Sequence, residues 1–272
     1  MSTTLPDLVT PHPPTAAQTE QFRACGHTRV DGLLSAREVD GYRPPIARIA
    51  GQAHAAARPL AERSTYDQAF LQLMNLWRRD PAIERFVRSN RLAATAAALL
   101  GVERVRIYHD QALFKEPGGG FTPWHQDAVY WPLEGNRCIT MWMPLVDVVP
   151  EMGVMTFAEG SHLAGQLGDA AISDRSETDF GDLVRHAGFP LSTPGPMAPG
   201  DATFHAGWTL HRAGPNTTPT MREVMTVIWF ADGLTVQPPV NREQERDLST
   251  WLPGCRSGDP AASPLNPVLP AP

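Results

Sequence analysis

The sequence predicts a mainly β fold with flanking helices, in which two sheets form a sandwich or jelly roll around a cavity. From Val105 onward, short apolar stretches alternate with Gly and Pro, a pattern typical of frequent short strands. Before Val105, apolar residues recur at helical spacing instead. With 272 residues and 42% hydrophobic content, the chain can bury a substantial core, and a single domain falls within that length.

Two capping boxes mark the first predicted helices. Thr15 and Gln18 stand three residues apart, as do Ser35 and Glu38, and each pair can satisfy the free backbone donors at a helix start. Between them, residues 28–34 read as a short strand and a turn.

The second of these helices meets a pair of prolines and is followed by two more helical patterns. Pro44-Pro45 should interrupt or redirect the helix, because proline lacks the backbone donor and clashes with the preceding turn. Apolar residues at helical spacing over 66–78 and 81–100 predict two stretches that cover one face of a sheet. We therefore expect the N-terminal half to be scaffold.

The second half should contribute the strands of the sandwich. Alternating and continuous apolar stretches predict strands over 105–115, 121–126, 137–147, 153–158, 201–205, 207–212 and 222–232. Inward side chains from these strands should line the cavity between the sheets.

Three segments depart from this pattern and set the predicted boundaries. Four prolines predict a flexible arm over 1–14, and six prolines predict a tail without a packed core over 253–272. A single domain then spans 15–252. Within it, the acidic insertion 163–190 is too long for an ordinary connection and is either a lid over the site or a solvated decoration.

Charge and cysteine content limit the partners. Lys and Arg total 23 against 29 Asp and Glu, so the chain offers no basic field for nucleic acid or an anionic membrane. Cys25, Cys138 and Cys255 are odd in number and widely spaced, which argues against a disulfide framework and a structural zinc site. No signal peptide or membrane span is visible, so we expect a cytoplasmic protein.

The segment Trp124-His125-Gln126-Asp127 carries the main chemical signal. If it is extended, His125 and Asp127 point to one face and can bind the same ion, whereas Gln126 points away. A third ligand from His211 would complete two imidazoles and one carboxylate, the set that suits non-haem Fe(II) oxygenases. His205 competes for that third position, since both histidines follow Gly200-Asp201 on extended chain.

Arg222 is the second signal. It lies eleven residues after His211 and opens the predicted strand 222–232. A guanidinium there can grip a carboxylate bidentately and stays charged at any physiological pH. A dicarboxylate cosubstrate would be held in this way.

Taken in order, these motifs resemble the phytanoyl-CoA dioxygenase-like family of Fe(II)/2-oxoglutarate oxygenases. The similarity runs over about 15–233. It rests on Phe114-Lys115-Glu116-Pro117-Gly118, Trp124-His125-Gln126-Asp127, Gly153-Val154-Met155 leading to Gly160-Ser161-His162, Gly200-Asp201-Ala202 leading to His211, and Arg222. The resemblance implies a double-stranded β-helix of cupin-like type that uses Fe(II), 2-oxoglutarate and O2.

The resemblance also implies roles for particular residues. His125, Asp127 and His211 would hold iron, and Arg222 would hold the distal carboxylate of 2-oxoglutarate. Trp142 stands where the family often has a Trp beside the cosubstrate. Family members often carry Ser two residues after the distal His, whereas this chain has Ala213, so cosubstrate binding should lean on other polar groups that alternation turns inward: Thr140, Gln111 and His109.

The substrate pocket is predicted from position alone. Alternation turns Leu113 inward, and aromatic residues near the metal ligands offer walls. The pocket residues we expect are Leu113, Gln126, Tyr130, Trp131 and Trp208.

We therefore expect a dioxygenase that hydroxylates, cyclises or epimerises a small organic substrate, a secondary metabolite of a biosynthetic pathway. Acyl-CoA hydroxylation is one alternative, although no Lys/Arg cluster near the motifs offers to dock the CoA phosphates. Another is a jelly-roll protein that binds a metal or ligand without oxidising anything. A metal-dependent hydrolase or isomerase on a cupin barrel is a third, and it would not need Arg222.

Overall fold

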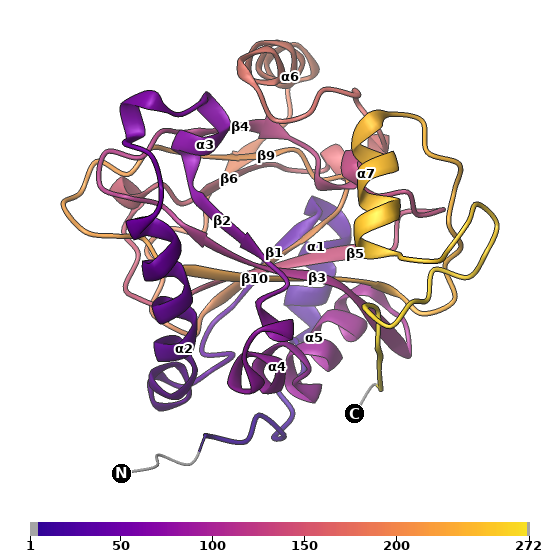
Figure 1. The fold of residues 1–272 in the computed structure, drawn as a ribbon. Helices are drawn as coiled ribbons and strands as arrows, with labels where there is room; N and C mark the ends of the chain where they lie inside the picture. Colours follow the sequence, from indigo (N-terminus) through magenta and orange to yellow (C-terminus); the bar gives the residue numbers. More distant parts are fainter. Residues whose placement is uncertain (1–4, 271–272) are drawn as a thin grey trace.

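Two antiparallel sheets face each other in the computed structural model, which describes residues 5–270 (Figure 1). The larger sheet has the strand order β1-β8-β5-β10-β3-β11, and β2 also pairs with β3. Its strands are β1 His27–Val30, β2 Leu71–Met74, β3 Arg104–Phe114, β5 Cys138–Pro144, β8 Ala202–Ala206, β10 Val224–Ala231 and β11 Val268–Pro270.

The smaller sheet has the order β4-β9-β6-β7 and lies above the larger one in Figure 1. Its strands are β4 Thr122–His125, β6 Met155–Ala158, β7 Leu191–Ser192 and β9 His211–Ala213. The predicted mainly β fold with flanking helices is confirmed. Six of the predicted strands match β3, β4, β5, β6, β8 and β10, whereas the predicted strand 207–212 is extended only from His211, and β2, β7 and β11 were not predicted.

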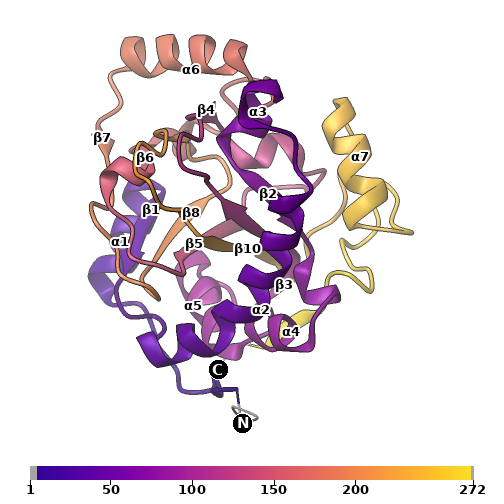
Figure 2. The same ribbon diagram turned by 60° about the vertical axis from the view of Figure 1, so that its left-hand side comes forward.

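Four helices cover the larger sheet on the side away from the smaller one (Figures 1 and 2). The main hydrophobic core lies between them and that sheet, and it joins side chains such as Ile46, Phe86 and Leu92 to Val227 and Trp229 of β10. These helices are α1 Ala16–Cys25, α2 Ala36–Ala55, α4 Pro81–Val87 and α5 Asn90–Leu100.

The remaining helices flank the other side of the molecule. Figure 2 shows α6 lying across the top and α7 standing apart at one side. These helices are α3 Thr65–Ala69, α6 Asp174–Ala187 and α7 Arg242–Trp251. Short 3-10 turns complete the chain: η1 Leu60–Glu62, η2 Leu76–Arg78, η3 Asp127–Tyr130, η4 Pro150–Met152 and η5 Ser161–Ala164. In residues 5–270, no helix is both long enough and apolar enough to cross a membrane.

Both predicted capping boxes are present, at Thr15 with Gln18 and at Ser35 with Glu38. The expected interruption at Pro44-Pro45 is wrong, because α2 continues through both prolines to Ala55. Its buried face, including Ile46 and Ala50 beyond the prolines, packs into the main core and outweighs the lost backbone bonds.

The predicted helix over 66–78 is wrong. The helix ends at Ala69, and 71–74 form β2, which pairs with β3. The buried Asp110 carboxylate accepts the backbone N–H groups of Leu76 and Trp77 at 3.0 and 3.3 Å. These long-range contacts override the local helical spacing. The stretch 81–100 is helical as predicted but divides at Ser89, whose side chain caps α5.

The N-terminal arm is packed rather than flexible over its described part, residues 5–14. Leu8 is 5% exposed. The backbone carbonyls of Thr10 and His12 accept hydrogen bonds from Arg91 and Thr95 of α5 at 2.7 and 2.9 Å. The arm is extended because of its prolines, but side chains of α5 hold it in place. Residues 1–4 lie outside the described part.

The predicted C-terminal tail without a core is also corrected. Residues 268–270 form β11 on the edge of β3, and Leu269 is 5% exposed. The buried Asn266 side chain donates to the Ile107 carbonyl at 3.0 Å, and Arg106 donates to the Asn266 carbonyl at 2.9 Å. The prolines therefore give this segment an irregular backbone path, and partners distant in sequence hold the segment in place.

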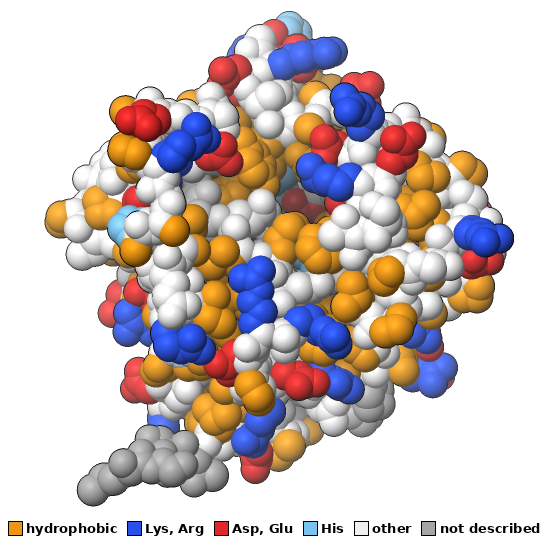
Figure 3. Space-filling model, in the orientation of Figure 1, with side chains coloured by type: hydrophobic (Ala, Val, Ile, Leu, Met, Phe, Trp, Pro, Cys, Tyr) orange, Lys and Arg blue, Asp and Glu red, His pale blue; other side chains and the backbone are white. Residues whose placement is uncertain are grey.

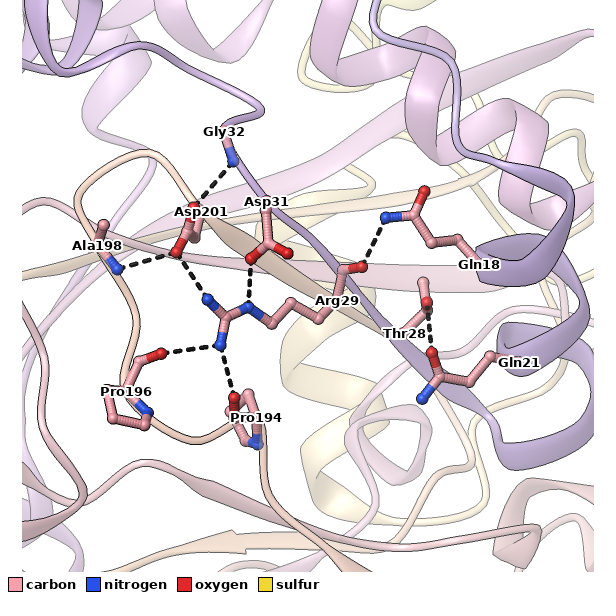
Figure 4. A network of polar contacts seen from close by, with 10 residues as sticks. All are labelled: Gln18, Gln21, Thr28, Arg29, Asp31, Gly32, Pro194, Pro196, Ala198 and Asp201. Atoms are coloured by element: carbon pink, nitrogen blue, oxygen red, sulfur yellow. Dashed lines mark hydrogen bonds and ion pairs between the residues drawn. The ribbon is translucent and has the colours of Figure 1, made fainter.

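The Gly200-Asp201 motif stabilises the edge of the larger sheet. Figure 4 shows Asp201 accepting hydrogen bonds from Arg29 at 2.9 Å, from the Gly32 backbone at 2.8 Å and from the Ala198 backbone at 2.9 Å. At Gly200, where φ is +90°, an added Cβ would lie 2.1 Å from the Leu34 carbonyl oxygen, so only glycine fits. The motif fixes the start of β8 and leads the chain toward the site histidines.

Candidate functional site

A cavity of about 560 Å³ lies between the two sheets. The space-filling view shows a hollow between α3 and α7, below α6, with histidine and acidic atoms at its depth (Figure 3). The cavity is lined by strands of both sheets, by the segment before α6 and by one face of α7.

The cross-strand pair His125 and His211 brings two imidazoles to the cavity from β4 and β9. Their ring centroids lie 4.1 Å apart. The Nδ1 atom of His125 lies 2.8 Å from the Pro123 carbonyl oxygen, and that of His211 lies 2.9 Å from the Thr209 carbonyl oxygen. Because each Nδ1–H donates to a backbone carbonyl, each Nε2 turns its lone pair toward the site, as a metal ligand requires.

Asp127 completes the cluster at the start of η3. Its Oδ1 lies 3.5 Å from His125 Nε2 and 3.7 Å from His211 Nε2. In the described part of the chain, these three residues form the one group of His, Cys, Asp or Glu side chains whose ligand atoms converge as for a metal ion, all within 4.8 Å of one another. The i, i+2 spacing predicted from the sequence does bring the two side chains together.

The electrostatics favour a negative Asp127 carboxylate beside a neutral His211 imidazole. Burial lowers the pKa of His211 well below its usual value, and the neighbouring His125 and His205 add to the effect. Burial alone would raise the pKa of Asp127, but the neighbouring His211, His125 and His205 imidazoles hold it well below its usual value. An anionic oxygen and two neutral nitrogens are the protonation states that bind a divalent cation.

His205 lies beside this cluster and contacts the other carboxylate oxygen. Its Nε2 is 3.1 Å from Asp127 Oδ2, and Thr140 Oγ1 donates to the same oxygen at 2.8 Å. The predicted role of Thr140, a hydroxyl for a cosubstrate oxygen, is therefore corrected, because the structure commits this hydroxyl to Asp127. Together the two contacts orient Oδ1 toward the imidazoles.

Side chains on the larger sheet form rows across the cavity. Thr140, Ile228 and His109 are paired in one row, and Trp142, Thr226 and Gln111 in the next. All of them line the cavity, as does Leu113 further along β3. The predicted inward alternation of β3 and β5 therefore holds in the structure. Gln111 accepts a hydrogen bond from Gln72 of β2 at 2.6 Å.

Arg222 is a buried cation without an acidic partner among the described residues. It is 1% exposed, its Nη1 donates to the Gly153 carbonyl, and its Nε has no hydrogen-bond partner. Its guanidinium carbon lies 5.4 Å from the centre of the Trp142 ring. Burial lowers its pKa to about 9, so the group stays charged at neutral pH. A buried charge of this kind is costly unless a ligand pairs with it.

The residues present fit both groups that the family pattern implies. Two imidazoles with fixed tautomers and one carboxylate match the ligands of a non-haem Fe(II) site. The incompletely bonded guanidinium of Arg222, in the same cavity, matches a carboxylate of 2-oxoglutarate.

Of the five predicted pocket residues, Leu113, Tyr130 and Trp131 line the cavity, but Gln126 and Trp208 do not. The Gln126 amide donates to the carbonyls of Gly165 and Trp208 at 2.8 and 2.6 Å and accepts the Leu167 N–H at 2.8 Å. It fastens the start of the insertion to the site. Trp208 packs instead against a satellite apolar cluster that includes Trp131 and Leu252.

The insertion 163–190 meets the cavity through Ala171 and Ile172. Its helix α6 packs on the outer face of the smaller sheet, where Phe180 and Val184 contact Trp124. Glu177 of α6 accepts a hydrogen bond from the Trp124 backbone at 2.9 Å. The insertion is therefore held against the smaller sheet and covers part of the cavity.

Two stretches that line the cavity were missed. Tyr66, Phe70, Gln72 and Met74 come from α3 and β2, where a helix was expected. The second stretch is α7, for which Asn241 capping the helix and polar residues at helical spacing were an available signal. Its cavity-lining residues are Glu243, Arg246, Asp247, Thr250 and Trp251.

Comparison with known proteins agrees with the kind of site that the geometry indicates. Residues 22–224 match the family model described as phytanoyl-CoA dioxygenase. A probable alpha-ketoglutarate-dependent hypophosphite dioxygenase from Stutzerimonas stutzeri is 27% identical over 232 residues, which cover 79% of this chain and 78% of that protein.

Two solved structures share the fold over nearly the whole chain. The non-haem alpha-ketoglutarate-dependent carbocyclase SnoK from nogalamycin biosynthesis superposes with a TM-score of 0.77 at 24% identity, covering 96% of this chain and 99% of that one. The corresponding epimerase SnoN, from the same biosynthesis, gives 0.73 at 25% identity, covering 93% and 97%.

Proposed function

The chain belongs to the phytanoyl-CoA dioxygenase family and is an Fe(II)/2-oxoglutarate-dependent dioxygenase, and we propose that its cavity oxidises a small organic molecule of secondary metabolism. His125, Asp127 and His211 would hold the iron. Arg222 would pair with the distal carboxylate of 2-oxoglutarate beside Trp142. When bound, the metal and cosubstrate supply the oxidising power, since O2 is consumed as 2-oxoglutarate is converted to succinate and CO2.

The protein's own residues orient these groups and keep water away. The backbone carbonyls of Pro123 and Thr209 fix the imidazole tautomers, while Thr140 and His205 orient the Asp127 carboxylate. Ile172 of the insertion lines the cavity and would help to exclude water from the reacting centre when substrate is bound.

The observation that carries the proposal is the pairing of two incomplete sites in one cavity. One is a donor set of two neutral imidazoles and a carboxylate, and the other is a buried guanidinium without an acidic partner. A hydrolase or isomerase would use the first but has no need for the second.

The metal assignment is tested by anaerobic Fe(II) binding and by succinate formation from 2-oxoglutarate. His125→Ala, Asp127→Ala and His211→Ala should each lose bound iron and at least about a hundredfold of turnover, because each removes a direct ligand. His186→Ala is the matched control, since His186 is exposed on α6. Iron binding that survives in His211→Ala and disappears in His205→Ala would reverse the assignment of the third ligand.

The substrate class follows from the size and charge of the cavity. Apart from Arg222, its cationic side chains are Arg212 and Arg246, and each already pairs with a carboxylate, Glu177 or Glu243. This arrangement offers no free cations for the phosphates of an acyl-CoA, so we favour a secondary metabolite, a view to which the likeness to the epimerase SnoN adds.

Mass spectrometry of candidate metabolites incubated with Fe(II), ascorbate and 2-oxoglutarate tests both substrate and outcome. Gain of one oxygen atom would indicate hydroxylation, and loss of two hydrogen atoms would indicate cyclisation or desaturation. An unchanged mass with altered retention would indicate epimerisation. Turnover of acyl-CoA esters alone would overturn the preference for a secondary metabolite.

A further inference from the structure

We propose that the α7 side of the cavity binds a protonated amine of the substrate, with Asp247 as its counter-ion and His109 as a second acceptor. This inference rests on the proposed function, because it assigns a substrate class to the same cavity. It concerns side chains that neither bind the metal nor pair with Arg222.

One face of α7 forms this wall. Glu243, Asp247 and Trp251 follow each other at intervals of four residues, so they lie on one side of the helix, and all three line the cavity. Glu245 on the same helix is exposed to solvent. In Figure 1, α7 stands at the edge of the two sheets.

Asp247 is a buried carboxylate with no cation closer than 4.0 Å among the described residues. It is 4% exposed, its Oδ2 accepts a hydrogen bond from the Tyr108 hydroxyl at 3.0 Å, and the Trp251 side chain also donates to it. The nearby Arg246 Nε lies 4.0 Å from Oδ1, but the Arg246 guanidinium is paired with Glu243 at 2.7 Å and its side chain is 64% exposed. The negative charge of Asp247 is thus left for a ligand.

His109 is the second group that points to a ligand. It is 2% exposed, it lines the cavity, and its buried Nδ1 has no hydrogen-bond partner within residues 5–270. Burial lowers its pKa to about 3, so the ring is neutral and one of its nitrogens can accept a hydrogen bond. An ammonium group donates up to three hydrogen bonds and accepts none, which suits a neutral imidazole and a carboxylate together.

His109 lies far from Arg222 along the chain of β3. The backbone of Arg222 pairs with that of Lys115. Lys115 lies six residues beyond His109, which is about 20 Å of extended chain. The register therefore gives no support to a contact of His109 with the distal carboxylate of 2-oxoglutarate, and a contact with the rest of the cosubstrate stays a prediction. Instead, its ring centroid lies 5.2 Å from that of Trp251 on α7.

Aromatic walls add to the preference for a cation. Trp251, Tyr130 and Tyr66 line the cavity, and the face of an aromatic ring attracts a nearby cation. A carboxylate ligand would instead meet the repulsion of Asp247. An alcohol would gain hydrogen bonds but not the charge pairing.

The acidity of Asp247 gives the binding a characteristic pH dependence. Burial raises the pKa of Asp247 to about 7, against hydrogen bonding from Tyr108. The charged and titratable groups around it are Arg246 and Glu243 on α7 and Tyr108 on β3. Above pH 7 the carboxylate is ionised and pairs with the ammonium, whereas below pH 7 it is protonated. Amine affinity should therefore rise as pH increases from about 6 to 8.

The test uses three matched probes: phenethylamine, 2-phenylethanol and phenylacetate. Binding to the protein loaded anaerobically with Fe(II) and 2-oxoglutarate is followed by saturation-transfer NMR or calorimetry. We expect phenethylamine to bind at least about tenfold more tightly than 2-phenylethanol or phenylacetate, because only the amine can form a buried charge-assisted contact with Asp247. Equal binding of the three probes, or tighter binding of phenylacetate, would overturn the proposal.

Asp247→Asn should abolish the amine preference and its pH dependence, and Glu245→Gln is the matched control on the exposed face of α7. If Asp247→Asn does not fold, the pH profile of the wild-type protein still decides, because a flat profile for phenethylamine contradicts the role of Asp247. An amine preference that persists unchanged in folded Asp247→Asn contradicts it equally.

The outcome is separable from that of the proposed function. Anaerobic titration with Fe(II) and 2-oxoglutarate reports the metal and cosubstrate ends, and the amine probes are also tested on the apoprotein. Loss of amine selectivity with intact cofactor binding defeats this inference alone. Failure of the wild-type protein to bind Fe(II) or 2-oxoglutarate defeats the proposed function, whichever probe binds at α7.

Discussion

The cavity has two parts that are built differently: a floor carried by strands and a cover carried by helices and loops. The floor consists of side chains from the strands and of Asp127 just after β4, and the cover consists of the insertion 163–190 and α7. In the floor, His125, His211 and Asp127 are each oriented by hydrogen bonds on the side away from the ion site. In the cover, Arg246 is 64% exposed over its side chain.

This difference indicates that the floor and the cover have different functions. A metal and a common cosubstrate need fixed geometry, which paired strands and second hydrogen bonds provide. A substrate that differs between relatives needs surfaces that can vary without disturbing that geometry, and loops and edge helices tolerate such variation. Changes in the floor should therefore impair cofactor use, whereas changes in the cover should impair the productive use of substrate.

The largest effect is expected at Arg222. Arg222→Ala should raise the 2-oxoglutarate requirement by about a hundredfold, because a charge-assisted contact is lost. Arg222→Lys should restore only part of it, since an ammonium lacks the planar fork. Steady-state kinetics with 2-oxoglutarate varied would measure this, and Arg246→Ala in the cover is the control. An unchanged cosubstrate requirement in Arg222→Ala would contradict the assignment.

The same division explains what could be predicted from the sequence. Strand alternation places His125 with Asp127 and turns Thr140, Trp142, Gln111 and Leu113 inward, because a period of two depends on local geometry alone. The family assignment, which is confirmed, also rests on motifs of the floor. Sequence alone did not reveal that the Thr140 hydroxyl is committed to Asp127, since that contact depends on two strands meeting.

The cover was predicted poorly for a physical reason. Gln126 looked like a pocket residue from its neighbours, but three hydrogen bonds to 165–167 and Trp208 turn it away. The same reason applies to one strand of the floor, because the stretch 66–78 has helical spacing, but β2 within it pairs with β3 and the residues after it bond to the Asp110 carboxylate. The position of α7 depends on the path of the whole C-terminal segment. The spacing of residues within a helix carries no information about that path.

The second effect concerns the residues that orient Asp127. His205→Ala and Thr140→Val should each weaken Fe(II) affinity by about tenfold, less than loss of a ligand, because they remove a contact to Asp127 Oδ2 and leave Oδ1 in place. Anaerobic equilibrium dialysis measures the affinity. If both variants bound Fe(II) as the wild type does, the proposed orientation of the carboxylate would be wrong.

The third effect tests the anchoring of the cover. Gln126→Leu removes three hydrogen bonds that hold the insertion, so water should enter and the substrate should sit less well against the oxidant. Product formed per succinate should fall severalfold while Fe(II) and 2-oxoglutarate still bind. The neighbouring exposed Gln166 provides the control, Gln166→Leu. Unchanged coupling in Gln126→Leu would make the insertion a solvated decoration.

The smallest effect is expected where the C-terminal segment supports the floor from its outer edge. Asn266 is fully buried; it donates to the Ile107 carbonyl of β3 and accepts from the Ser263 backbone at 3.2 Å. Asn266→Ala should lower the free energy of unfolding by about 1–3 kcal/mol, because buried backbone groups lose their partner. Denaturant unfolding measures this change, with the exposed Asn90→Ala as control.

The 2-oxoglutarate requirement should stay the same in Asn266→Ala. Ile107 lies on the strand that carries His109 and Gln111, but a register shift in the pairing with β10, between His109 and Ile107, turns its side chain toward the main core, on the other side of the sheet from the cavity. A loss of stability without a loss of cofactor use would show that the segment supports β3 and takes no part in the chemistry. A raised cosubstrate requirement would instead mean that the floor depends on the C-terminal segment for its geometry, and the boundary between the two parts of the cavity would have to be redrawn.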